Sequence, residues 1–142
     1  MSGTTPKKIM IIEDDKSIQD IYMLNFQASG YEVILEGDGL SGISSVVEKK
    51  PDIILLDVMM PNMDGFAFLK AMKENTSVNI PVVVCSNLSD KETYDKAFAA
   101  GATAVLLKVN YSGKELVQKI DLILAESKSK HKDPHQEPPQ SA

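Results

Sequence analysis

Asp52-Ile53-Ile54-Leu55-Leu56-Asp57 is the stretch that decides the fold. Four consecutive branched apolar residues stand between two acids, without the alternation that marks a strand with one solvent-exposed face. A strand that is apolar on both sides is typical of a parallel sheet covered by helices on both faces. The stretch therefore predicts an α/β domain.

Outward from this stretch, short apolar runs alternate with amphipathic segments five times along the chain. Repeated βα units of this kind build a doubly wound parallel sheet. The predicted strands are Lys8–Glu13, Glu32–Glu36, Asp52–Asp57, Pro81–Ser86 and Thr103–Leu107.

Apolar residues at helical spacing follow each predicted strand. Gly30 and Gly101 stand where left-handed C-caps are expected, and Asp15, Asp90 and Ser112 are predicted N-caps. The predicted inward faces of the five helices are Ile18, Ile21, Tyr22 and Phe26; Leu40, Ile43 and Val47; Phe68, Leu69 and Met72; Tyr94, Ala97 and Phe98; and Leu116, Ile120 and Ile123.

The length of 142 residues suits one domain with a substantial core. We expect that domain to occupy residues 1–126, followed at 127–142 by a polar, Pro-rich tail that is disordered. His131 and His135 in the tail are expected to be solvated, because Pro134 interrupts the helix that could bring them together on a metal.

Charge and apolar patterning exclude several classes of partner. A net charge of −5 argues against the broad positive field of a direct nucleic-acid binder. The apolar runs are shorter than the ~20 residues of a membrane span, so a cytoplasmic protein without membrane contact is expected. The single cysteine, Cys85, lies in an apolar run and is predicted to be a buried thiol.

Polar residues end the predicted strands at the sheet edge where open α/β folds bind ligands. They are Glu13, Asp14 and Asp15 after the first strand, Asp57 after the third, Ser86 after the fourth and Lys108 after the fifth. Taken singly, each has an ordinary explanation as a helix cap, a turn residue or a solvated lysine. Together, carboxylates ~4 Å apart would repel by about 4 kcal/mol per pair at a dielectric constant of about 20. The cluster therefore predicts a compensating Mg²⁺ beside Lys108.

Such a site lets a carboxylate act as nucleophile toward phosphorus, with metal and lysine neutralising the phosphoryl oxygens. The Ser86 hydroxyl can add a hydrogen bond to the product. Glu36-Gly37-Asp38-Gly39 lacks the spacing of a phosphate-binding Gly-rich loop, so no ATP or NAD site is predicted.

The stretch Leu56-Asp57-Val58-Met59-Met60-Pro61-Asn62-Met63-Asp64-Gly65 resembles the phosphoacceptor loop of the response-regulator receiver family of two-component signalling. The resemblance extends from about Lys7 to Glu126. It implies a flavodoxin-like (βα)5 fold with strand order 2-1-3-4-5.

The resemblance also implies roles for the clustered residues. Asp57 would be the phosphorylation site, with Ser86 and Lys108 responding to the phosphoryl group. Mg²⁺ would be held by Glu13, Asp14, Asp57 and the backbone carbonyl of Met59. Asp15 fits a helix cap better than a metal ligand.

Three positions depart from the family pattern. Val109 stands where a cis proline usually follows the lysine, Val105 replaces a frequent aromatic residue, and Asn87 replaces a small one. These changes bear on how a signal reaches the face formed by the fourth helix, fifth strand and fifth helix. Met59 and Leu88 are apolar where relatives position a hydrolytic water, which leads to the hypothesis of slow self-dephosphorylation.

The predicted function is that of a stand-alone receiver, a monomer or weak dimer, which takes a phosphoryl group from a histidine kinase or histidine phosphotransfer protein. It would then bind a downstream protein whose identity the sequence leaves open. It would catalyse only its own phosphorylation and slow dephosphorylation. The alternative is a receiver-like adaptor that works without phosphorylation. A hydrolase of the haloacid dehalogenase type is disfavoured, because Met59 stands where that chemistry needs a second acid.

Overall fold

The computed structural model describes residues 6–57, 65–74, 79–87 and 91–129. Within them lies a five-stranded sheet in the order β2-β1-β3-β4-β5, with every neighbouring pair parallel. The predicted fold class and strand order are confirmed. The strands are β1 (Lys8–Ile12), β2 (Glu32–Glu36), β3 (Ile53–Leu56), β4 (Val82–Ser86) and β5 (Ala104–Leu107).

Several predicted strand ends are wrong by one residue. Glu13 and Asp57 lie just beyond β1 and β3, and Asp52, Pro81 and Thr103 lie just before their strands. Glu13 and Asp57 each keep one backbone hydrogen bond to the neighbouring strand, from the Glu13 N–H to the Glu36 carbonyl and from the Asp57 N–H to the Ile12 carbonyl. Both acids therefore stand at the carboxyl edge of the sheet.

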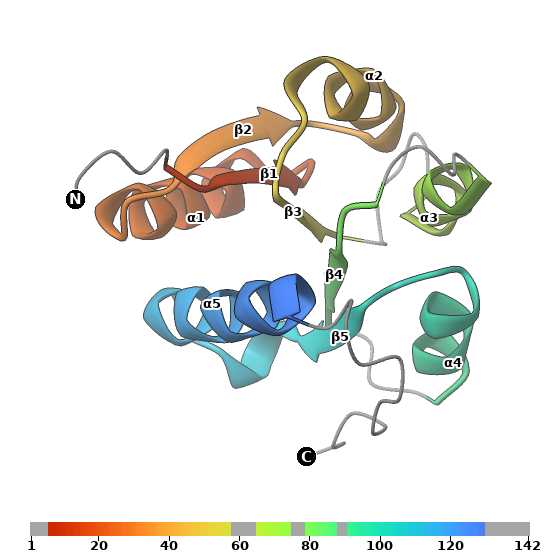
Figure 1. Cartoon of the computed structure of the whole chain (residues 1–142). Coiled ribbons are helices and arrows are strands. Elements are labelled where there is room, and N and C mark those ends of the chain that lie inside the picture. The colour runs from red at the N-terminus through yellow and green to blue at the C-terminus, as the bar shows by residue number, and fades with distance from the viewer. Residues whose placement is uncertain (1–5, 58–64, 75–78, 88–90, 130–142) are drawn as a thin grey trace.

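Helices cover both faces of the sheet (Figure 1). The helices are α1 (Lys16–Ala28), α2 (Gly39–Lys49), α3 (Gly65–Glu74), α4 (Lys91–Ala99) and α5 (Gly113–Ser129), with a short 3₁₀ turn η1 at Lys108–Asn110. Helices α1 and α5 pack on one face, and α2, α3 and α4 pack on the other.

The apolar runs of the strands divide between two cores. Ile9 and Ile11 of β1 pack with α1 and α5, whereas Met10 and Ile12 pack with the helices on the opposite face. All four are 0% exposed, which explains why the strands show no polar alternation. Cys85 is buried in the first core, as predicted.

Helix caps follow the sequence prediction where the structure describes them. The Asp15 carboxylate accepts from the backbone N–H groups of Ser17 and Ile18, and Ser112 and Glu115 cap the start of α5 reciprocally. Gly30 and Gly101 have positive φ values of 91° and 115°. The remaining predicted cap, Asp90, lies outside the described residues. An N-cap that the sequence analysis did not single out is Asp38, which accepts from the Ser41 N–H at the start of α2.

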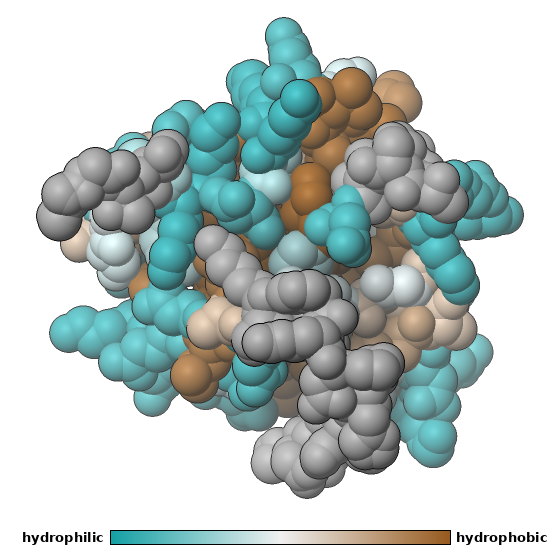
Figure 2. All heavy atoms as spheres, in the orientation of Figure 1, coloured by the Kyte–Doolittle hydropathy of each residue, from teal (hydrophilic) through white to brown (hydrophobic). Residues whose placement is uncertain are grey.

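The predicted inward face of α2 is wrong at two of its three residues, and only Ile43 packs partly buried against the core. Leu40 and Val47 are exposed by 66% and 59%, and brown spheres mark apolar surface over α2 in Figure 2. The buried side is instead formed by Gly39, Gly42, Ser45 and Val46. A Cβ at Gly42 would stand 2.7 Å from Ile12 Cδ1, so small residues let α2 approach the sheet closely.

The first helix shows a smaller error of the same kind. Ile21 is 53% exposed, whereas Phe26 is fully buried and Tyr22 packs partly against the core.

Helix α5 reaches Ser129, three residues past residue 126, where the sequence analysis places the end of the domain. Buried Ile120, Ile123 and Leu124 anchor the helix, and no Gly or Pro stops it before Pro134. Residues 130–142, with His131 and His135, lie outside the described part. Within the described residues, no helix is both long and apolar enough to cross a membrane.

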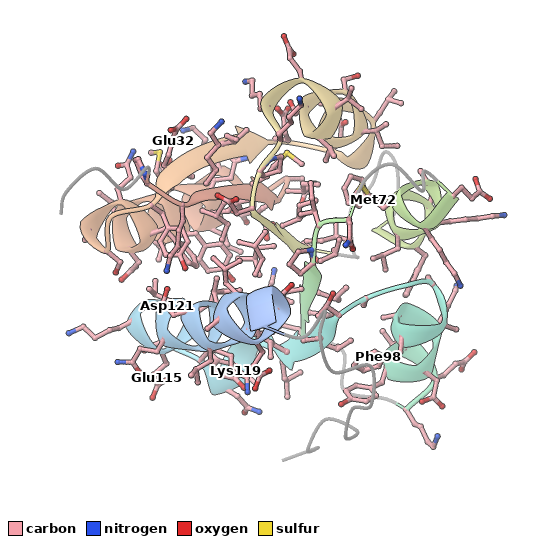
Figure 3. The ribbon with its side chains drawn as sticks, viewed as in Figure 1. Glu32, Met72, Phe98, Glu115, Lys119 and Asp121 are labelled. Carbon is pink, nitrogen blue, oxygen red and sulfur yellow. The ribbon has the colours of Figure 1, made fainter. Side chains whose placement is uncertain are left out.

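A polar contact ties α5 to the turn before β2. The buried Tyr31 hydroxyl donates to Asp121 Oδ1 at 2.5 Å. In Figure 3, Asp121 lies on the side of α5 away from Glu115 and Lys119. Burial and the bond to the Asp121 carboxylate raise the pKa of Tyr31, so its hydroxyl stays protonated at neutral pH.

Candidate functional site

A hollow of about 620 Å³ opens at the carboxyl edge of the sheet. The strand register brings the ends of β1, β3, β4 and β5 to this edge, with Ile12 opposite Leu56 and Ser86 opposite Leu107. Loop residues that follow the strands and the first turn of α1 line the hollow: Glu13, Asp14, Asp15, Lys16, Ser17, Ile18, Asp57, Asn87 and Lys108. Four of the predicted site residues, Glu13, Asp14, Asp57 and Lys108, therefore do come together.

Asp57 is the buried acid at the base of the hollow. It is 7% exposed, and its N–H continues the sheet by donating to the Ile12 carbonyl at 3.1 Å. The ammonium of Lys108 lies 3.4 Å from its Oδ2 atom. A carboxylate so placed is held in one position and faces the open hollow.

Glu13 shares that lysine. Its Oε1 atom lies 3.2 Å from Lys108 Nζ, and its Oε2 atom accepts from the Asp15 N–H at 3.1 Å. Both oxygens are thus engaged by the protein, and the residue is only 2% exposed. Burial and repulsion from Asp57 raise the pKa of Glu13, against the opposing effect of Lys108.

Lys108 remains a cation at neutral pH. Burial disfavours its charged form, but attraction to Asp57 and Glu13 outweighs this and raises its pKa. The side chain is 14% exposed, so these ion pairs are largely shielded from solvent.

Three carboxylates form a group that could hold a metal ion. Ligand oxygens of Glu13, Asp14 and Asp57 all lie within 4.8 Å of one another. One ammonium cannot neutralise three carboxylates, and an all-oxygen set suits a hard divalent cation. Met59, the fourth predicted ligand, lies outside the described residues.

Ser86 ends β4 as predicted and is 1% exposed, but it does not line the hollow. The next residue, Asn87, does line it, so the substitution noted in the sequence faces the site directly. Leu88 lies outside the described residues.

The segment after Lys108 forms the 3₁₀ turn η1 with Val109 75% exposed, and no cis peptide occurs among the described residues. Val105 packs partly buried against the core shared with α4.

The sequence analysis missed Gln19 of α1. Its side-chain amide donates to the backbone carbonyl of Glu13 at 2.6 Å. The bond is made to backbone, so no pairing of side-chain types in the sequence could have indicated it. Tyr22 was expected only as a core residue, yet its hydroxyl lies 3.9 Å from Cys85 Sγ below the site.

Comparison with known proteins places this geometry in a family. Residues 9–121 match the response regulator receiver domain. The chain is 33% identical over 102 residues to the DNA-binding dual master transcriptional regulator RpaA of Synechocystis, covering 71% of this chain and 42% of RpaA. It is 31% identical over 123 residues to the alkaline phosphatase synthesis transcriptional regulatory protein PhoP of Bacillus subtilis, covering 85% and 50%. The chain thus spans about half the length of these curated relatives.

Solved structures show the same likeness. The chemotaxis response regulator CheY4 of Vibrio cholerae superposes with a TM-score of 0.77 at 28% identity, covering 84% of this chain and 99% of that one. The receiver domain of the Francisella response regulator 1452 superposes with a TM-score of 0.77 at 26% identity, covering 87% of this chain and 99% of that one. The match over residues 9–121 and the shared strand order show that this chain belongs to the response regulator receiver family of two-component systems.

Proposed function

We propose that this receiver accepts a phosphoryl group on Asp57 from the phosphohistidine of a histidine kinase or histidine phosphotransfer protein, in a Mg²⁺-dependent reaction. The observation that carries the proposal is the contact of Lys108 with both Asp57 and Glu13 at the floor of an open acidic hollow. Receivers are signalling domains, so the reaction is the chain's own modification rather than turnover of a metabolite.

In the proposed step, an Asp57 carboxylate oxygen attacks phosphorus while the phosphorus–nitrogen bond of phosphohistidine breaks. The donor imidazole leaves with the bonding electron pair and takes up a proton. Lys108 lies beside the nucleophile and can turn its ammonium toward the oxygens of the incoming group, where negative charge is concentrated.

The acids of the hollow are the proposed holders of Mg²⁺. Asp14 and Asp57 are the proposed carboxylate ligands, and Glu13, with both oxygens engaged, serves mainly to fix Lys108 and to add negative charge. When bound, Mg²⁺ neutralises phosphoryl oxygens during transfer. The same acids without a cation would repel a phosphodonor.

The proposed signal is a change in the face formed by α4, β5 and α5. Phosphorylation replaces the singly charged Asp57 carboxylate with a phosphoryl group that carries about two negative charges, and this group attracts Lys108, which now bonds Glu13. Because Lys108 directly follows β5 and begins η1, its movement acts on the segment between β5 and α5. Because Val105 has no aromatic side chain that could couple Asp57 to this face, displacement of the segment between β5 and α5 transmits the change.

We further propose that the receiver acts in the cytoplasm as a single-domain regulator or relay intermediate. Similarity to CheY4, which the chain covers to 99%, supports this arrangement. RpaA is a DNA-binding regulator by name and PhoP a transcriptional regulatory protein by name, and we propose neither activity for this chain. The apolar residues Met59 and Leu88 support slow self-dephosphorylation.

The test is transfer from a phosphohistidine donor and from acetyl phosphate, read by intact mass. Wild type and Asp95→Asn, a control on the exposed face of α4, should gain one phosphoryl group, and Asp57→Asn should gain none. Modification of Asp57→Asn would move the site elsewhere. Absence of modification in the wild type would favour the phosphorylation-independent adaptor.

A further inference from the structure

The carbonyl of Glu13 is held by a side chain rather than by the sheet. The Glu13 N–H still bonds the Glu36 carbonyl of β2 at 3.0 Å, but its own carbonyl turns to the Gln19 amide at 2.6 Å. Gln19 lies in the first turn of α1 and is half-buried. The turn that leads from β1 into α1 is therefore closed by this bond.

Asp14 follows that carbonyl and is the acid with the least support. It is exposed, and its carboxylate makes no hydrogen bond to any residue that the structure describes. Glu13 and Asp57, in contrast, are both buried and bonded to Lys108. The position of the Asp14 side chain thus depends on its backbone.

The backbone of Asp14 depends in turn on Gln19. The Glu13 carbonyl and the Asp14 nitrogen belong to one planar peptide, so fixing the carbonyl fixes the plane from which Asp14 projects. On the C-terminal side of Asp14, Asp15 is fixed by its N–H bond to Glu13 and by capping α1. On the N-terminal side, the Gln19 side chain constrains the peptide between Glu13 and Asp14.

We propose that Gln19 is a positioning residue that holds Asp14 in place for the divalent cation. The inference rests on the proposed function, since it concerns the metal site of that reaction. Gln19 acts through the Glu13 carbonyl and takes no part in the transfer step itself. It lowers the cost of binding by keeping Asp14, whose carboxylate has no hydrogen-bonding partner among the described residues, in the binding arrangement before the cation arrives.

The test measures Mg²⁺ affinity directly, by isothermal titration calorimetry without a phosphodonor. Gln19→Leu keeps the approximate length and removes the donor. Loss of an outer partner of a metal ligand commonly weakens affinity by 10–100-fold, and because this bond reaches the ligand through backbone we expect about 10-fold. The control Gln27→Leu, an exposed glutamine on the same helix, should change the dissociation constant less than twofold.

Two further measurements distinguish this positioning role of Gln19 from a purely structural one. In phosphorylation assays, Gln19→Leu should raise the Mg²⁺ concentration for half-maximal rate and leave the rate at saturating Mg²⁺ within about twofold. Gln19→Glu adds negative charge near the cation, which alone would tighten binding, but it cannot donate to the carbonyl when ionised. If Gln19 positions Asp14, Gln19→Glu should also bind Mg²⁺ more weakly than wild type. Gln19→Glu also provides the test if Gln19→Leu does not fold.

An unchanged dissociation constant in Gln19→Leu, or binding in Gln19→Glu as tight as wild type or tighter, would overturn the inference. Failure of the proposed function looks different. In that case the wild type binds Mg²⁺, and Gln19→Leu binds it more weakly, yet Asp57 takes no phosphoryl group.

Discussion

Lys108 donates to Glu13 at 3.2 Å, across the space between the ends of β5 and β1, two strands that are not neighbours in the sheet. With the 3.4 Å contact to Asp57, this makes one ammonium the counter-ion of two buried acids. Any new anion at Asp57 therefore competes with Glu13 for the Lys108 ammonium.

Replacing Lys108 by Met should destabilise the protein strongly in the absence of metal. It would leave two carboxylates buried close together without a cation, and breaking such a pair costs about 3 kcal/mol. Urea unfolding at pH 7 measures the loss. The control Lys91→Met removes an exposed ion pair with Asp95 and should change little. Equal losses in the two variants would show that the buried contacts have no special weight.

Added Mg²⁺ should restore part of the stability lost in Lys108→Met, since the cation compensates the same acids. A metal-independent midpoint of unfolding for this variant would contradict the assignment of the acids as a cation site.

Gly42 should tolerate no larger side chain. Its missing Cβ would stand 2.7 Å from Ile12 Cδ1 and 3.3 Å from Phe68 Cε1, in the close contact of α2 with the sheet. Gly42→Val should lower the unfolding free energy by about 1–3 kcal/mol through overpacking. Gly37→Val, at a glycine with open space around it, should cost less than about 1 kcal/mol. Thermal unfolding of the two variants measures these losses. An unchanged unfolding free energy in Gly42→Val would mean that α2 lies farther from β1.

The Cys85 thiol should make stability fall at alkaline pH. Burial raises its pKa from an ordinary value of 9.0 to about 11. Between these values the unfolded chain has released the proton and the folded chain still holds it, so the unfolding free energy decreases as pH rises.

This effect is isolated by comparison with Cys85→Ala. The stability advantage of wild type over the variant should shrink by up to about 2–3 kcal/mol between pH 8 and about 11. Parallel stability profiles of the two proteins over this range would refute the expected behaviour.

The sequence predicts the sheet and the acids well because both depend on strong local signals. An uninterrupted run such as Ile53–Leu56 has few alternatives to a buried strand, and Asp57 directly after it must emerge at the sheet edge. Leu40 and Val47 of α2 were mispredicted as inward-facing, because the contact of this helix with Ile12 is made by small residues that carry little hydrophobic signal.

Gln19 was not predictable for a different reason. A bond from a side chain to a backbone carbonyl depends on where the chain turns, and residue types alone do not encode that direction. The three extra residues of α5 depend on cooperative helix extension from a buried anchor, which composition does not show.

Phosphorylation of Asp57 is tested most simply by the intact mass of the protein after incubation with acetyl phosphate, with Mg²⁺ and with the metal chelated. Wild type should gain one phosphoryl group only when Mg²⁺ is present, and Asp57→Ala should gain none in either condition. A gain that persists in Asp57→Ala, or a wild type that stays unmodified with Mg²⁺, would contradict phosphorylation at Asp57.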